Sequence, residues 1–293
     1  MKLNYDCMIC QLNKELDLAR GIVPEARRVA FLKEVFQAMG QVDIGCASPA
    51  ITPLLDQVNA RYGFARPDYE PLKKRYNDRM MAILPQLRRR VEACADPLAQ
   101  AIKLSRAGNY IDFGAFKAID DGQLDALIQR AWDEALDPAE YAALTADLAR
   151  AARLTYVTDN CGEVVLDGLV LEQLARRFPQ LEMTALTRGG PVLNDATEAD
   201  ARYVGLDRYA RIAGNGSDLA GCQMSRISPQ ARQLLEGSDV IIAKGMANFE
   251  TLCACGLNVY YLFLCKCDYF ARRLSVPLMT GMLVNERRMN LAG

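Results

Sequence analysis

Five consecutive residues, Asp159-Asn160-Cys161-Gly162-Glu163, place a carboxylate and an amide between a short apolar run and a stretch of helical periodicity. In open α/β sheets, ligands bind at such junctions, where a strand ends and a helix begins. The N–H groups of the first helical turn favour an anion at the same place. A carboxylate beside a phosphate requires a cation between them. The sequence therefore suggests a divalent metal that joins protein oxygens to a phosphoryl group.

Three further segments follow predicted strands and carry polar residues. Asp195 comes just before a helix that Thr197 could cap, although Asp195 could also do no more than help to cap that helix. The loop Gly214–Asp218 offers N–H groups that could form an anion-binding nest, or it is an ordinary turn. Lys244 ends another strand, where a lone lysine is more often a solvated surface charge. Together, oxygen ligands and a lysine at one sheet edge predict phosphoryl chemistry.

The elements that would position these residues lie in the second half of the chain. Residues 1–150 show helical periodicity and predict an all-helical amino-terminal domain, whereas residues 151–293 alternate apolar runs with amphipathic helices. This alternation predicts an α/β domain with a doubly wound, mostly parallel, Rossmann-like sheet, against which the helical domain would pack. The predicted strands are Leu154–Thr158, Glu182–Thr187, Tyr209–Ala213, Val240–Ala243 and Val259–Leu264. The predicted helices between and after them are Val164–Arg177, Thr197–Val204, Pro229–Leu235, Phe249–Cys255 and Tyr269–Leu274.

Composition restricts the chemistry and the partners. The 293 residues have a formal net charge of −1, which predicts no nucleic acid and no anionic membrane as partner. The start of the chain has no apolar signal core and no stretch is long enough to span a bilayer, so we expect a cytoplasmic protein. The chain has no histidine, which excludes catalytic triads and histidine-ligated zinc. Proton transfer must therefore use another side chain or a metal-bound water.

Several motifs in one order resemble a known family. They are Asp159–Glu163, the Arg188–Thr197 segment, Gly216-Ser217-Asp218 and the run Lys244-Gly245-Met246-Ala247-Asn248-Phe249-Glu250. This series resembles the DUF89 family of metal-dependent damage-control phosphatases (ARMT1-like). The segment Gly108–Asp112 and the cysteine pairs near both ends are similar to its prokaryotic CxxC-containing branch. The resemblance extends over nearly the whole chain.

The resemblance implies a metal-dependent phosphomonoester hydrolase that acts on small phosphometabolites, such as sugar phosphates or damaged cofactor phosphates. Asp159, Asn160 and Asp195 would hold one Mg²⁺, Mn²⁺, Co²⁺ or Ni²⁺ ion, and Lys244 would neutralise charge on the phosphoryl group. Asp159, Asp195 and Lys244 would thus be the catalytic set. Direct attack by water and an aspartyl-phosphate intermediate both stay open. The substrate side would be lined by Asn109, Asp112, Cys161, Gly162, Arg188, Gly216, Ser217, Asp218 and Asn248.

Two positions depart from the family pattern. Where such sequences commonly read Lys-Gly-Gln-Gly-Asn, this chain has Met246 and Ala247. The loss of an amide and of a glycine would alter substrate contacts or the approach of the loop.

The ten cysteines suggest a second site. Cys7 and Cys10 form a CxxC pair, and Cys265 and Cys267 form a CxC pair. Four thiolates from the two ends of the chain could hold one structural zinc ion or act as a redox site, although buried inert thiols are the commoner fate of cysteine. Two alternative functions stay open. The doubly wound sheet is also compatible with an S-adenosylmethionine-dependent methyltransferase. The cysteine pairs are compatible with a non-catalytic, thiol-rich metal-binding or redox protein.

Overall fold

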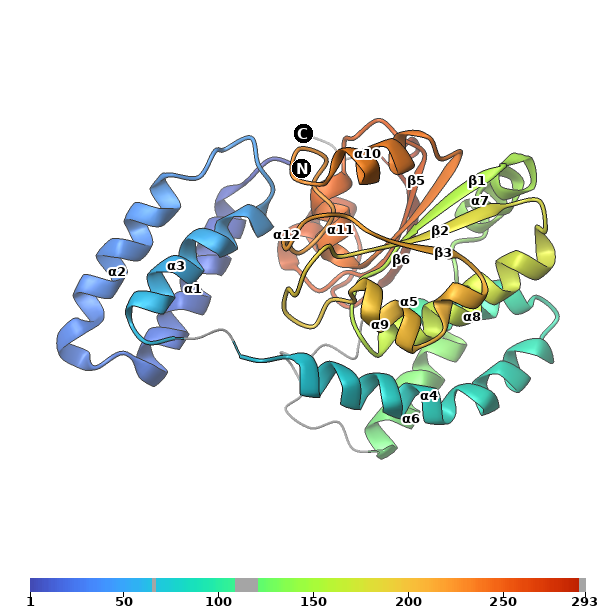
Figure 1. Cartoon of the computed structure of the whole chain (residues 1–293), viewed down its shortest axis with the longest axis horizontal. Coiled ribbons are helices and arrows are strands. Elements are labelled where there is room, and N and C mark those ends of the chain that lie inside the picture. Colours follow the sequence, from blue (N-terminus) through green and yellow to red (C-terminus); the bar gives the residue numbers. More distant parts are fainter. Residues whose placement is uncertain (65–66, 109–120, 290–293) are drawn as a thin grey trace. The chain divides into compact units, whose positions relative to one another are not determined.

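The computed structural model describes residues 1–64, 67–108 and 121–289 (Figure 1). The chain separates into two compact units, Met1–Asp68 and Tyr69–Gly293. The first unit is helical, and its core gathers around Phe31, Val35 and Ile51. Its elements are α1 (Tyr5–Ile22), α2 (Glu25–Gly40), the 3-10 helix η1 (Ser48–Ile51) and α3 (Thr52–Arg61).

The second unit contains a mixed α/β fold. Its first helices are α4 (Glu70–Glu92), α5 (Pro97–Ala107), α6 (Asp121–Asp133) and α7 (Pro138–Arg150). The strands are β1 (Arg153–Val157), β2 (Glu182–Thr187), β3 (Arg211–Gly214), β4 (Val240–Lys244), β5 (Val259–Leu264) and β6 (Gly281–Asn285). The helical elements among the strands are α8 (Glu163–Arg177), α9 (Glu198–Tyr203), η3 (Leu206–Arg208), α10 (Pro229–Glu236), α11 (Gly245–Leu252) and α12 (Asp268–Leu274).

The strands form one sheet in the order β3-β2-β1-β4-β5-β6. The first five are parallel, and β6 pairs with β5 in the antiparallel direction. After β3 the chain returns to the centre of the sheet and adds β4 on the other side of β1. The strand order therefore reverses between β1 and β4, and the carboxyl ends of these two strands flank the switch point at which such sheets bind ligands.

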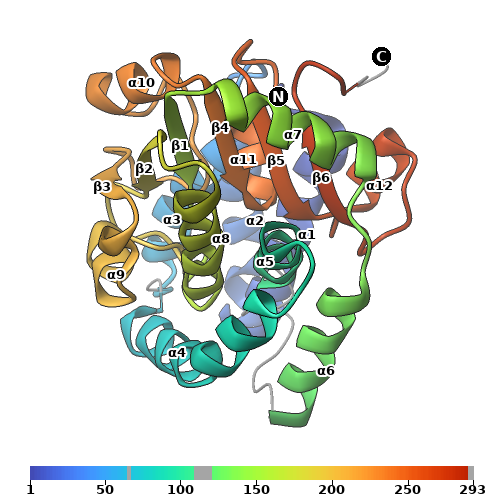
Figure 2. The ribbon, with the colours of Figure 1, turned by 90° about the vertical axis from the view of Figure 1, so that its right-hand side faces the viewer.

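Helices cover both faces of the sheet. Figure 2 shows α5, α7 and α8 in front of the strands and α11 behind them. Strands β4 and β5 are buried along their whole length, as expected for parallel strands covered on both faces. The doubly wound, mostly parallel sheet predicted from the sequence is confirmed.

The boundary between the units differs from the one expected near residue 150. Helices α4 to α7 belong to the same unit as the sheet, because α4 and α5 pack on α8 and α7 packs on β6. Periodicity identified these segments as helices, but it contains no information about which helices share a core. The helical unit that separates from the sheet is therefore limited to Met1–Asp68.

Two elements differ from the sequence prediction. β6 was not predicted; its five residues follow a helix and pair with β5 in the antiparallel direction. The helix expected at Phe249–Cys255 is α11, which begins at Gly245 and ends at Leu252. Cys253 has an extended backbone and Ala254 has a φ of 68°, so the helix cannot continue through them. In the described ranges, no helix is both long and apolar enough to cross a bilayer.

Candidate active site

The ends of β1 and β4 approach each other closely at the switch point. Gly245 follows β4 with a φ of 79°, and a Cβ at this position would overlap the Asp159 carboxylate. The Asn248 amide then donates to the Thr158 carbonyl at 3.0 Å, which ties α11 to the end of β1. Glycine is required at position 245 both by its backbone conformation and by the space that the carboxylate occupies.

Backbone hydrogen bonds join the segment after β1 to the segment after β2. Ala196 N donates to the Asp159 carbonyl at 2.7 Å, and Cys161 N donates to the Asn194 carbonyl at 2.8 Å. Between these bonds, Asn160 and Asp195 form an isolated antiparallel bridge. The three residues predicted to hold the metal, Asp159, Asn160 and Asp195, therefore lie on two short segments that pair with each other.

Arg188 connects the two carboxylates. Its Nε donates to Asp195 Oδ2 at 2.6 Å, one terminal nitrogen donates to Asp159 Oδ1 at 3.1 Å, and the other donates to Asn248 Oδ1 at 3.1 Å. All four side chains are buried. Burial raises the pKa of Asp159 well above its usual range and Asp195 raises it further, whereas Arg188 lowers it. Burial lowers the pKa of Arg188, but the two carboxylates more than offset this effect and hold it above its usual value.

This oxygen set fits a hard divalent cation. Asn160 donates its amide N–H to Asp159 Oδ2 at 2.9 Å, which places its side chain beside this carboxylate. Two carboxylates and one amide oxygen are ligands that Mg²⁺ and Mn²⁺ prefer. Among the described residues, no three histidine, cysteine or acidic side chains are grouped to hold a metal. A metal at this site would therefore depend on the amide oxygen of Asn160 as a third protein ligand.

A second buried cation lies beneath α8. Lys244 Nζ donates to a Glu163 oxygen, to Asp167 Oδ1 at 2.8 Å and to the Ser105 carbonyl at 3.0 Å. The Ser105 and Tyr156 hydroxyls both donate to the same Asp167 oxygen, at 2.6 and 2.8 Å. An ammonium group has three N–H donors, and all three have a partner here. Contact between Lys244 and a phosphoryl group would require one of these bonds to break.

The Lys244 cluster contains more acid than base. Glu163 Oε2 and Asp167 Oδ2 are buried and have no hydrogen-bond partner in the described structure. Burial raises the pKa of Glu163 to about 7, although the charge of Lys244 acts to lower it. A protonated Glu163 would bring the net charge of these three side chains to zero.

The N–H groups that follow Asn160 are not available to a phosphoryl oxygen. Cys161 N donates to the Asn194 carbonyl, and Gly162 N donates to Asn77 Oδ1 at 2.6 Å. The expectation that these two groups stabilise a phosphoryl oxygen is not met in this structure, because each already has an internal acceptor. Cys161 is buried, and burial raises the pKa of its thiol. This environment agrees with an inert turn residue at position 161.

Residues 3–280 match the family described as the damage-control phosphatase ARMT1-like domain. The chain belongs to this family. The resemblance read from the strand-end motifs is therefore confirmed over nearly the whole chain.

Two relatives in this ARMT1-like family are named damage-control phosphatases. A protein of Archaeoglobus fulgidus named damage-control phosphatase is 34% identical over 215 residues, which cover 71% of this chain and 72% of the relative. Damage-control phosphatase PH1575 of Pyrococcus horikoshii is 28% identical and covers 94% of this chain and 96% of its own. The crystal structure of that DUF89 family protein matches this fold with a TM-score of 0.81 at 23% identity, over 98% of this chain and 99% of that one.

The remaining predicted residues of this ARMT1-like chain lie in several settings. The Asn215 side chain accepts from Gly189 N and Ser217 N, both at 2.9 Å, so it holds together the loops after β2 and β3. Because Ser217 N is taken, the expected anion nest lacks one of its donors. Gly216 and Asp218 are exposed on the same loop. Asn109 and Asp112 lie outside the described residues.

The helix after β2 is capped by residues other than Asp195. Thr197 is the N-cap of α9 and forms a capping box with Asp200. The carboxylate of Asp195 instead accepts from Arg188. The N-cap position of α9 is therefore filled by Thr197, and Asp195 has a buried ion pair with Arg188.

The predicted thiolate site would need residues from both units. Cys7 and Cys10 lie on α1, Cys265 directly follows β5, and Cys267 is the N-cap of α12. A zinc or redox site made by all four residues stays a prediction.

One of the two departures from the family pattern, Met246, has a structural contact. Its sulfur accepts from Lys266 N at 3.2 Å and so holds the start of α11 to the segment after β5.

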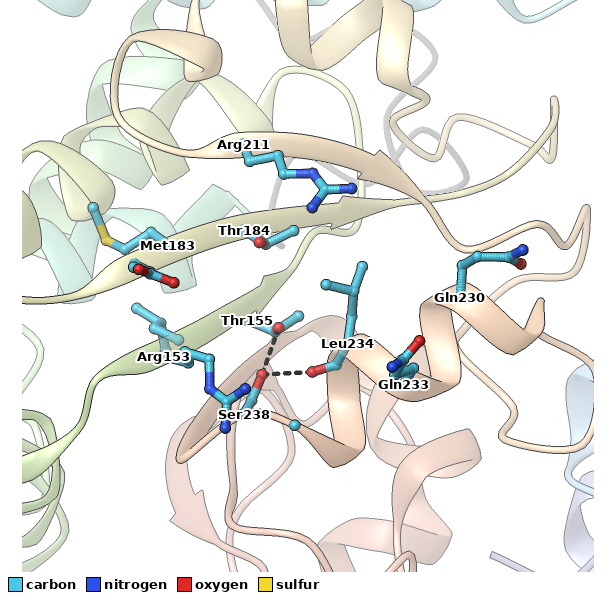
Figure 3. A pocket seen from close by; sticks show the side chains of 12 residues that line it. Arg153, Thr155, Met183, Thr184, Arg211, Gln230, Gln233, Leu234 and Ser238 are labelled. Atoms are coloured by element: carbon cyan, nitrogen blue, oxygen red, sulfur yellow. Dashed lines mark hydrogen bonds between the residues drawn. The ribbon is translucent and has the colours of Figure 1, made fainter.

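A pocket of about 610 Å³ lies at the other edge of the sheet. Figure 3 shows Arg153, Thr184 and Arg211 from β1, β2 and β3 beside Gln233 and Leu234 of α10. Arg153 and Arg211 begin their strands, whereas Asp159 and Arg188 follow strand ends. This pocket is therefore separate from the candidate active site. A large pocket volume does not mark the catalytic site in this fold.

Several residues around the site carried no recognisable signal in the sequence. Lys73 and Asn77 on α4 lie in a run of polar residues that reads as a solvated helix face, yet both are buried. Asp167 follows Glu163 by one helical turn, and this spacing could have indicated a shared face. Ser105 and Tyr156 lie within ordinary helix and strand patterns.

Proposed function

We propose that this ARMT1-like chain is a divalent-metal-dependent phosphatase that hydrolyses small phosphorylated metabolites. The observation that carries the proposal is the convergence of Asp159, Asn160 and Asp195 at the switch point of the sheet, with Arg188 between the carboxylates. The names of two relatives, both damage-control phosphatases, support the same class of reaction.

Asp159, Asn160 and Asp195 would hold the ion through oxygen atoms. When bound, a divalent ion supplies Lewis-acid stabilisation of the charge on phosphoryl oxygens. Arg188 is a cation in direct contact with both carboxylates. Its guanidinium has five N–H donors, and the three hydrogen bonds described leave two for a phosphoryl oxygen. An arginine fixed by two carboxylates and an amide is already oriented before substrate binds.

Proton transfer must use groups other than histidine. Asp195 lies inside the site, and Asp218 is exposed on the loop that borders the site beside Gly190. These carboxylates are the candidates to accept a proton from the attacking water. Lys244 would stabilise the structure beneath the site, where its charge is shared with Glu163 and Asp167.

The test is hydrolysis of p-nitrophenyl phosphate by metal-stripped protein titrated with Mg²⁺, Mn²⁺, Co²⁺ and Ni²⁺. We expect turnover only after a metal is added, and no turnover from the Asp159→Ala variant under the same conditions. A screen of sugar phosphates and cofactor phosphates with the best metal then ranks the substrates by kcat/KM. Turnover by metal-free protein, or full turnover by Asp159→Ala, would contradict the proposal.

A further inference from the structure

Helix α4 presents two buried polar side chains to the active-site segments. Lys73 and Asn77 are four residues apart, so they lie on one face of the helix. They are 1% and 0% exposed. Buried polar groups at such positions need specific partners, and each of these two has one on a different catalytic segment.

Asn77 holds the turn after β1. Its Oδ1 accepts from Gly162 N at 2.6 Å, two residues after Asn160. Gly162 has a φ of 81°, and a Cβ there would lie 3.3 Å from the Tyr76 Cβ. The turn that carries Asp159 and Asn160 thus rests directly on α4, and a hydrogen bond fixes its position along the helix.

Lys73 holds the segment after β2. Its Nζ donates to Asp200 Oδ2 at 2.7 Å, and the same oxygen accepts from Thr197 N and Oγ1. Thr197 in turn forms a parallel bridge with Arg188. Lys73 therefore acts on the capping box at the end of the segment that carries Asp195.

We infer that Lys73 and Asn77 are positioning residues that set the distance between the two segments carrying the metal-binding oxygens. Metal sites tolerate little displacement of their ligands, and residues that orient ligands typically contribute about tenfold to hundredfold to metal affinity. One rigid helix that holds both segments supplies such control. This inference rests on the proposed function, because it concerns the same oxygen set.

The test compares Asn77→Leu with Asn77→Asp and with a matched control on the same helix. Leucine removes the acceptor for Gly162 N, aspartate keeps an oxygen there, and Arg88→Met removes the α4–α8 ion pair between Arg88 and Glu172. Three quantities are measured: Mn²⁺ affinity of the metal-stripped protein by electron paramagnetic resonance, hydrogen exchange of the Gly162 amide, and the free energy of unfolding in urea.

We expect Asn77→Leu to weaken Mn²⁺ binding about tenfold or more and to speed exchange at Gly162, and Asn77→Asp to restore much of both. Arg88→Met should lower stability without changing Mn²⁺ affinity. Lys73→Met removes the ion pair with Asp200 and should also weaken Mn²⁺ binding. This variant tests the inference if Asn77→Leu does not fold. Equal losses of affinity in Asn77→Leu and Arg88→Met, or wild-type affinity in both Asn77→Leu and Lys73→Met, would overturn the inference. A wild-type protein that binds no divalent ion would instead overturn the proposed function, and this inference with it.

Discussion

Two buried clusters in this protein each hold one basic side chain between two carboxylates, but they differ in what they can bind. Arg188 lies between Asp159 and Asp195, and Lys244 lies between Glu163 and Asp167. The arginine joins two segments at the strand ends and has N–H donors to spare. The lysine uses all its donors on the Ser105 carbonyl of α5 and on the two carboxylates of α8. A buried cation between two carboxylates can therefore contact a ligand only where it keeps N–H donors that no protein group has taken.

The clusters also differ in their neighbours. Asn160 adds a side-chain amide to the Arg188 cluster, at the edge where ligands enter an open sheet. Ser105 and Tyr156 add hydroxyl groups to the Lys244 cluster, which lies under α8. Under the proposed function, the first cluster would bind the metal and the second would have a structural role.

The largest effect is expected from the Arg188 cluster. Asp195→Asn should lower metal-dependent kcat/KM by about a thousandfold, which corresponds to the several kcal/mol that a metal ion contributes to charge stabilisation. The unfolding midpoint in urea should change little, because asparagine still accepts from Arg188. Substrate hydrolysis under saturating metal is the measurement. Turnover within threefold of the wild type would remove Asp195 from the site.

The Lys244 cluster should respond mainly in stability. Lys244→Met leaves two buried carboxylates without a cation and should cost about 3–5 kcal/mol in the free energy of unfolding, measured in urea. Adding Glu163→Gln should recover part of this loss, since it removes one of the uncompensated charges. A Lys244→Met variant with native stability and no turnover would reverse the assignment and make Lys244 a phosphoryl-binding group.

Gly245→Ala tests the contact between the ends of β4 and β1. The added methyl group would overlap the Asp159 carboxylate at a positive φ, so we expect Mn²⁺ affinity to fall about tenfold. Gly256→Ala is the matched control, because Gly256 has a φ of 78° but open space around its Cβ position. Both variants should lose stability through backbone strain, by about 1 kcal/mol or more. Equal metal affinities in the two variants would mean that Gly245 serves only the turn.

The last prediction concerns pH. Because the pKa of Glu163 is raised to about 7 from an unfolded value near 4.5, its contribution favours folding fully below pH 4.5 and is lost as pH rises through 7. Glu163→Gln should flatten this decline in the free energy of unfolding, measured in urea between pH 5 and 8. A variant with the same pH dependence as the wild type would show that Glu163 stays ionised.

Much of the fold was predictable from local patterns. The five parallel strands have apolar runs of ordinary strand length, and the helices between them have clear periodicity. β6 was missed because it pairs in the opposite direction, outside the strand–helix alternation. The boundary between the units was displaced because periodicity does not report that α4 and α5 pack on α8.

The candidate site was predictable only where its residues lie at strand ends. Asp159, Asn160, Asp195 and Arg188 come together because the carboxyl ends of neighbouring parallel strands meet at one edge. The partners of Lys244 and of Gly162 N were not predictable, since Ser105 and Asn77 come from helices far away in the chain. Long-range contacts of this kind leave no local pattern in the sequence.

The most direct test of the account is a Mn²⁺ titration of metal-stripped protein, followed by electron paramagnetic resonance, for the wild type, Asp159→Asn and Glu163→Gln. The account predicts one bound Mn²⁺ per chain in the wild type and in Glu163→Gln, and loss of that binding in Asp159→Asn. Unchanged binding in Asp159→Asn, or loss of binding in Glu163→Gln alone, would contradict the assignment of the metal to the strand-end oxygens.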